Sequence, residues 1–178
     1  MDQNLLDLYK SVSTWTASKV AGATDLLDAP TPCDDWDVRH LLNHMLDTQQ
    51  YFQDVALQKD ASLPASNPPD LLGDDPVADM RQAQAKTLSA FEPAGTIDKT
   101  GPSLGIAFSD QLLHGWDLAT ATQQDATMPE GLPEAAYELI HGAFTEEQRK
   151  GVFKPEVDPG PDASTQDKLL AYTGRDPR

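Results

Sequence analysis

The sequence has very little cysteine and few basic residues. Its 178 residues contain a single cysteine, Cys33, and 13 lysines and arginines against 29 acidic residues, so the net charge is −16. One cysteine excludes a disulfide within the chain and is typical of proteins in a reducing compartment. The negative charge makes nucleic acid and anionic membrane surfaces unfavourable partners, because both repel an acidic protein.

Long apolar runs are missing as well. No segment approaches the roughly 20 consecutive apolar residues that span a membrane. The first ten residues, MDQNLLDLYK, do not combine a basic segment with the apolar run of a secretory signal. We therefore expect a cytoplasmic protein with no membrane partner, folded as a single domain over residues 1–178.

Apolar residues recur at helical spacing over much of the chain, and no segment shows the two-residue alternation of a strand. The spacing predicts four main helices, a fifth that buries Phe144, and a short last one, at about residues 2–23, 38–59, 76–91, 104–122, 133–144 and 164–173. The expected N-cap residues are Asp37, Asp74 or Asp75, and Ser164. Two aperiodic segments predict an internal loop (residues 61–75) and a connection (residues 92–103). Residues 151–178 are expected to form a C-terminal extension, which is irregular up to Ala163 and then holds the last helix. The predicted fold is all-α, an up-down four-helix bundle with additional short C-terminal helices.

Polar residues on one side of the fourth predicted helix suggest a metal site. Asp110 and His114 are four residues apart, so a helix places them one turn apart beside an apolar stripe. His44 flanks the apolar stripe of the second helix, which can approach the fourth across a bundle. Two imidazoles and one carboxylate, with one position left open, form a ligand set that suits catalytic zinc. The alternative interpretation is that His44, Asp110 and His114 are unrelated polar residues at the borders of the apolar helix faces and bind no metal.

Other candidate residues are ranked below these three. His40 lies four residues before His44 and allows a second histidine pair, but it falls in the first turn of the helix, where exposure is expected. Asp117 is interpreted as a group that orients a ligand, or as a structural residue, rather than as a ligand. The rest are interpreted as a surface or interfacial histidine, a buried inert cysteine and two core tryptophans: His141, Cys33, Trp36 and Trp116.

Three stretches resemble one known family in order along the chain. TPCDDWDVRHLLNHMLDTQQYF and DQLLHGWDLATATQQD resemble the two signatures of the DinB-like, mycothiol-dependent maleylpyruvate isomerase superfamily. FKPEVDPGPDASTQDKLLAYTGRDPR resembles the ending of one uncharacterised actinobacterial branch of that superfamily. The resemblance covers nearly the whole chain, and the ordered combination is more specific than any one stretch.

The resemblance implies a DinB-like bundle in which His44, Asp110 and His114 bind a divalent metal. Zinc is the first expectation, and nickel or iron also suits this ligand set. The resemblance further implies a low-molecular-weight thiol such as mycothiol as cofactor and a small electrophile as substrate. The expected reaction is thiol transfer or cis–trans isomerisation, and a homodimer is compatible with such bundles. A non-catalytic metal-binding or stress-response module is the alternative.

Two departures from the family pattern limit the substrate assignment. The acidic ligand is Asp110, whereas the isomerase members more often have glutamate, which is longer by one methylene. The chain is also expected to lack the additional C-terminal domain that contributes to the substrate pocket of the full-length isomerases. Maleylpyruvate is therefore not assigned as the substrate.

Overall fold

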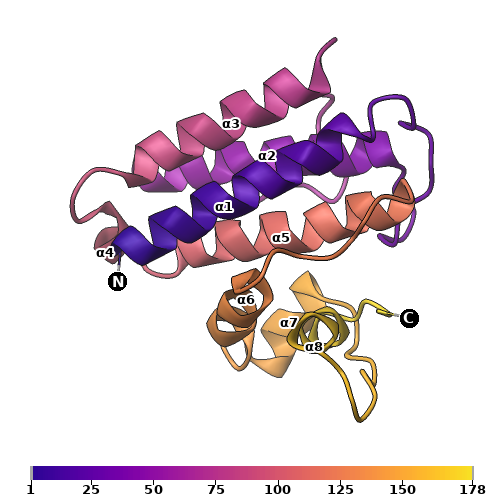
Figure 1. Ribbon diagram of the computed structural model, residues 1–178. Coiled ribbons are helices and arrows are strands. Elements are labelled where there is room, and N and C mark those ends of the chain that lie inside the picture. The colour runs from indigo at the N-terminus through magenta and orange to yellow at the C-terminus, as the bar shows by residue number, and fades with distance from the viewer. Residues whose placement is uncertain (1, 178) are drawn as a thin grey trace. The chain divides into compact units, whose positions relative to one another are not determined.

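The structure, a computed structural model, describes residues 2–177 and is built from helices alone over that range (Figure 1). The helices are α1 (Asp2–Ala21), α2 (Val38–Ala56), α3 (Pro76–Phe91), α4 (Thr96–Thr100), α5 (Ser103–Ala121), α6 (Leu132–Ile140), α7 (Glu146–Val152) and α8 (Thr165–Tyr172). The predicted all-α fold is confirmed. Within the described residues, every helix is too short or too polar to span a bilayer.

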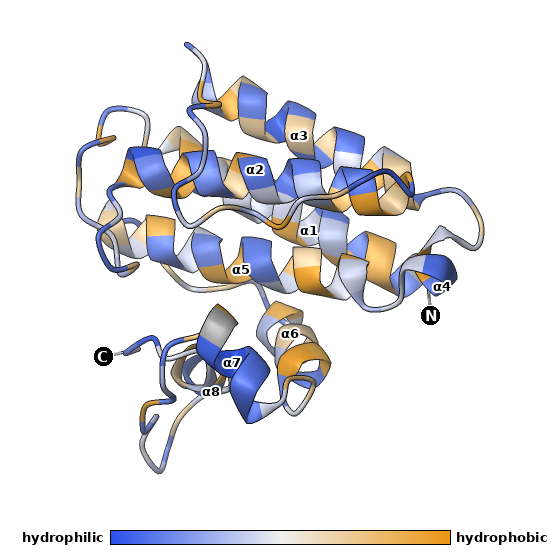
Figure 2. Ribbon diagram, turned by 180° about the vertical axis from the view of Figure 1, so that it is seen from behind, coloured by the Kyte–Doolittle hydropathy of each residue, from blue (hydrophilic) through white to orange (hydrophobic). Residues whose placement is uncertain are grey.

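The chain divides into two compact units, Met1–Thr127 and Met128–Arg178. The first unit holds the four long helices α1, α2, α3 and α5, which lie side by side in Figure 1, and the short α4. In this unit α1 packs against α3 and α5, and α2 packs against the same two helices. Figure 2 shows apolar and polar residues interspersed along all four, as in amphipathic helices that bury one side.

The long helices do not simply alternate in direction. The loop after α2 runs back along that helix, since Ala65 donates its backbone N–H to Asp47 and Leu71 donates to Asn43. The loop therefore returns to the start of α2, and α3 runs parallel to α2 (Figure 1). A connection of this length can span the helix, because extended chain covers about 3.3 Å per residue against about 1.5 Å in a helix.

Local capping signals set the helix starts, as the sequence predicts. The Asp37 side chain accepts a hydrogen bond from the His40 N–H at 2.8 Å at the start of α2. Asp75 caps α3, with Pro76 at its first turn. The apolar side of α2 then joins one buried cluster with residues of α1, of the turn after α1, and of α3 and α5: Val20, Ala23, Val38, Leu41, Leu42, Met45, Leu46, Met80 and Leu118.

The second unit holds α6, α7 and α8, and here the sequence prediction needs correction. The fifth predicted helix ends at Ile140, so Phe144 lies beyond its end and contacts the Phe153 ring instead. The chain turns at Gly142, whose φ of 75° favours glycine, before α7 begins. The helices α4 and α7 were not predicted from apolar spacing. Ser164 caps α8 through reciprocal hydrogen bonds with Asp167, as expected.

Candidate metal centre

The structure brings together the three residues proposed as metal ligands. His44 lies on the flank of α2, while Asp110 and His114 lie one turn apart on α5, which packs against α2. One potential ligand atom from each residue lies within 4.8 Å of the other two. His114 Nε2 is 3.5 Å from Asp110 Oδ1, and the two imidazole centroids are 5.0 Å apart. His44 is thus close to two residues that follow it by 66 and 70 positions in the sequence.

The donor set and the spacing fit a divalent cation. A tetrahedral ion with bonds of about 2.1 Å holds its ligand atoms about 3.4 Å apart, close to the separation of His114 Nε2 and Asp110 Oδ1. All three side chains are half-buried. His44 Nδ1 is buried and has no hydrogen-bond partner among the described residues. An unpartnered buried nitrogen costs about 1–3 kcal/mol, which a coordinate bond to this imidazole would help to offset.

Asp117 fixes the orientation of the His114 ring. Its carboxylate is fully buried, and its Oδ2 lies 2.9 Å from His114 Nδ1. When Nδ1–H donates to this oxygen, the lone pair of Nε2 points away from Asp117 and toward Asp110. A carboxylate on the far nitrogen of a metal-binding imidazole is the usual way to set its tautomer and raise its basicity. The hydrogen bond to His114 Nδ1 is the contact that an orienting role for Asp117 requires.

A second group of potential ligands includes Cys33, which was interpreted as inert. Cys33 is half-buried, and its thiol donates a hydrogen bond to Asp117 Oδ2 at 3.4 Å. Cys33, His114 and Asp117 also meet the distance requirement for a metal site. In that group, however, Asp117 and His114 Nδ1 are already bonded to each other. Asp117 and Cys33 therefore act on His114 through hydrogen bonds on its Nδ1 side. The group of His44, Asp110 and His114 is the better candidate for an ion site.

The two histidines have opposite electrostatic environments. Burial and the neighbouring His114 lower the pKa of His44 to about 3. Burial also lowers the pKa of His114, but the charge of Asp110 and the hydrogen bonds to Asp117 and Cys33 outweigh it and raise that pKa to about 10. Without a metal, His114 is therefore an imidazolium at neutral pH and His44 is neutral. A cation between the two helices is already favoured by the surrounding carboxylates.

Trp36 packs against the core cluster, as the sequence predicts, and its ring also covers His40 and His44. Its ring centroid lies 4.7 Å from that of His44 and 5.0 Å from that of His40, and the side chain is only partly buried. The loop before α2 holds it in place, because Thr31 donates to the Trp36 carbonyl from both its N–H and its hydroxyl. Nothing in the residue type or its spacing signals this position.

The remaining candidates lie elsewhere. His40 stacks on Trp36, and its Nε2 is 3.4 Å from the Ser66 carbonyl oxygen, so it does not join the three ligand atoms. His141 is exposed at the end of α6 in the second unit and stacks on Tyr137. Trp116 is a core residue, as expected.

The comparisons with known proteins identify the family of this chain. The family model described as mycothiol maleylpyruvate isomerase N-terminal domain matches residues 12–119. The chain belongs to this family. The match covers most of the four-helix unit and includes all three candidate ligands. The helices that carry the candidate ligands, α2 and α5, thus lie mainly within the region that the family model matches.

Two relatives are similar to this family member over most of their length. They are uncharacterized protein MT0763 of Mycobacterium tuberculosis (strain CDC 1551 / Oshkosh) and uncharacterized protein Rv0738 of Mycobacterium tuberculosis (strain ATCC 25618 / H37Rv). Each is 29% identical over 168 residues, which covers 85% of this chain and 86% of the relative. No solved structure matches this chain significantly.

Proposed function

We propose that this protein is a divalent-metal-dependent enzyme that uses a low-molecular-weight thiol, such as mycothiol, for transfer to an electrophile or for isomerisation. The observation that carries the proposal is the convergence of His44, Asp110 and His114 within 4.8 Å in a member of this family. Three protein ligands leave a coordination position for a small molecule, whereas a structural zinc site usually has four. Zinc is the first expectation, and nickel or iron suits this ligand set as well.

The chain's own residues have distinct parts in such an enzyme. His44, Asp110 and His114 would hold the ion, and Asp117 would keep the His114 imidazole in the tautomer that presents Nε2. When bound, a divalent ion acts as a Lewis acid that lowers the pKa of a thiol, so that the reactive thiolate is present near neutral pH. Trp36 places an apolar ring over the histidines, which excludes water from that side and strengthens the electrostatic interactions there.

A thiol-conjugation assay tests this function. The zinc-loaded protein is incubated with mycothiol and an electrophile, either chlorodinitrobenzene or an activated alkene such as maleate. Loss of free thiol reports conjugation, and conversion of maleate to fumarate, in which the thiol adds and is then released, reports isomerisation. We expect conjugation faster than in buffer alone, lost after chelation of the metal and lost in His114→Ala. His141→Ala, a histidine of the second unit, is the matched control and should keep full activity.

The same assay separates catalysis from metal binding alone. If the protein binds one metal ion but leaves both thiol consumption and the conversion of maleate to fumarate at their uncatalysed rates, it is a non-catalytic metal-binding module. A rate that chelation and His114→Ala leave unchanged would rule out a metal-activated thiol.

A further inference from the structure

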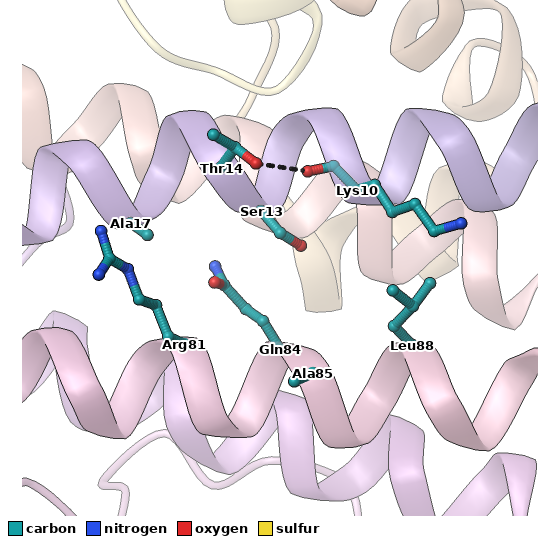
Figure 3. A pocket seen from close by; sticks show the side chains of 8 residues that line it. All are labelled: Lys10, Ser13, Thr14, Ala17, Arg81, Gln84, Ala85 and Leu88. Carbon is teal, nitrogen blue, oxygen red and sulfur yellow. Dashed lines mark hydrogen bonds between the residues drawn. The ribbon is translucent and has the colours of Figure 1, made fainter.

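A groove of about 340 Å³ runs between α1 and α3, on helices that carry none of the candidate metal ligands (Figure 3). Its size falls at the lower end of the range for small-molecule sites. Side chains from α1 form one wall and side chains from α3 the other, and the two helices run in opposite directions along it. The family match and the proposed thiol chemistry give this groove no role.

The charge of the groove is opposite to that of the protein. Two of its eight lining residues are the cations Lys10 and Arg81, and none of the eight is acidic. The protein as a whole has 29 acidic residues against 13 basic ones, so two cations without a carboxylate in one groove run against its net charge. Lys10 is within 3.8 Å of Asp7, but both side chains are well exposed, and such pairs contribute little. Lys10 can therefore turn to a ligand.

The two cations stand at opposite ends of the groove. In Figure 3, Arg81 rises from α3 toward Ala17, while the Lys10 side chain extends from α1 past Leu88. Lys10 and Ala17 are seven positions apart on α1, which corresponds to about 10 Å at the helical rise of about 1.5 Å per residue. A ligand that meets both cations must therefore be elongated and carry an anionic group at each end.

The floor between the cations is polar and held in place. Ser13 and Gln84 face each other across the groove (Figure 3). Gln84 is almost fully buried and donates through Nε2 to Gln111 Oε1 at 2.6 Å, and Gln111 donates in turn to Ser13 Oγ at 3.3 Å. Both floor side chains are thus fixed through one residue of α5. Preorganised polar groups lower the cost of ordering a site around its ligand.

We infer that this groove is a binding site for a small elongated dianion of the dicarboxylate class. One carboxylate pairs with the guanidinium of Arg81, whose fork can donate two parallel hydrogen bonds, and the other pairs with the ammonium of Lys10. The middle of the ligand lies over Ser13 and Gln84. The site is separate from the proposed metal centre, so it does not depend on a metal or on the thiol reaction.

Calorimetric titration of the full-length protein tests this inference. The probes are a series of straight-chain dicarboxylates from succinate to suberate, with hexanoate and inorganic phosphate as ligands that have only one anionic group. We expect saturable binding that strengthens with chain length until both cations are reached, and weaker binding of hexanoate and phosphate. Arg81→Gln and Lys10→Gln should each weaken the best dicarboxylate about tenfold, the size of one charge-assisted hydrogen bond.

Lys59→Gln is the matched control, because it removes one positive charge that is also exposed, also lies near an aspartate and is outside the groove. It should change the affinity less than twofold. The titration is repeated with His114→Ala, which should bind the dicarboxylate unchanged even if the metal proposal fails. The inference is overturned if no dicarboxylate binds saturably, if phosphate binds as well as the best dicarboxylate, or if Lys59→Gln weakens binding as much as Arg81→Gln does.

Discussion

In the metal-free protein, His44 and His114 should hold opposite protonation states over the whole neutral pH range. Their rings are only 5.0 Å apart, yet burial lowers the pKa of His44 to about 3, while Asp110 and Asp117 raise that of His114 to about 10. The ordinary value for both is 6.5. A pH titration of the metal-free protein therefore tests the electrostatics of the centre directly.

The sign of each shift sets its effect on folding and on metal binding. The raised pKa of His114 contributes stability that is fully present below pH 6.5 and is lost as the pH rises through about 10. The lowered pKa of His44 contributes stability above pH 6.5 that is lost as the pH falls toward about 3. A metal ion must displace the His114 proton but none from His44, so zinc affinity should rise about tenfold per pH unit between about pH 7 and 9.

The assay is nuclear magnetic resonance of the imidazole nitrogens in ¹⁵N-labelled, metal-free protein. The chain has only four histidines, and single His→Ala variants assign their signals. We expect His114 to remain an imidazolium through neutral pH and His44 to remain neutral. Asp117→Asn should bring the pKa of His114 back toward its ordinary value. Titration of both rings near pH 6.5 would refute the described arrangement of carboxylates around His114.

Three further predictions concern single substitutions. Asp117→Asn should weaken zinc binding at pH 9 by about 10–100-fold, because it removes the carboxylate that accepts from His114 Nδ1. A competition titration with a chromophoric chelator measures this affinity, and an unchanged value would mean that Asp117 does not orient the ring. Gly115→Ala would place a Cβ 2.5 Å from the Trp15 ring. The free energy of unfolding in urea should therefore fall by about 1–3 kcal/mol. An unchanged unfolding midpoint would contradict the close packing of α1 on α5. Asp37→Ala should cost about 1 kcal/mol in the same assay through loss of the α2 N-cap, and Asp37→Ser should restore most of it.

The parts of the fold that rest on local signals could be predicted from the sequence. Asp37 and Asp75 mark helix starts by their own side-chain chemistry, and the apolar spacing after each one gives the helix. The short α4 carries no such signal, because it follows Gly95 without a side-chain cap. A signal for α7 does exist, since Thr145 and Gln148 form a capping box that apolar spacing alone does not reveal.

In the candidate site, too, some residues could be predicted from local spacing, and others depend on how distant segments pack. Asp110 and His114 are neighbours through helix geometry, so their spacing was sufficient to propose them. The contacts of Trp36 with the histidines and of Cys33 with Asp117 depend on how separate segments pack, which no local pattern encodes. The direction of α3 likewise depends on hydrogen bonds from the loop after α2 to that helix.

The most direct test of the central claim is the metal content of the purified protein and its variants, measured by elemental analysis after saturation with zinc and removal of the excess. The account predicts one equivalent in the wild type and in His141→Ala, and a large loss in His44→Ala and in His114→Ala while both remain folded by circular dichroism. Full zinc stoichiometry in either of those two folded variants would contradict the claim that α2 and α5 hold one ion between them.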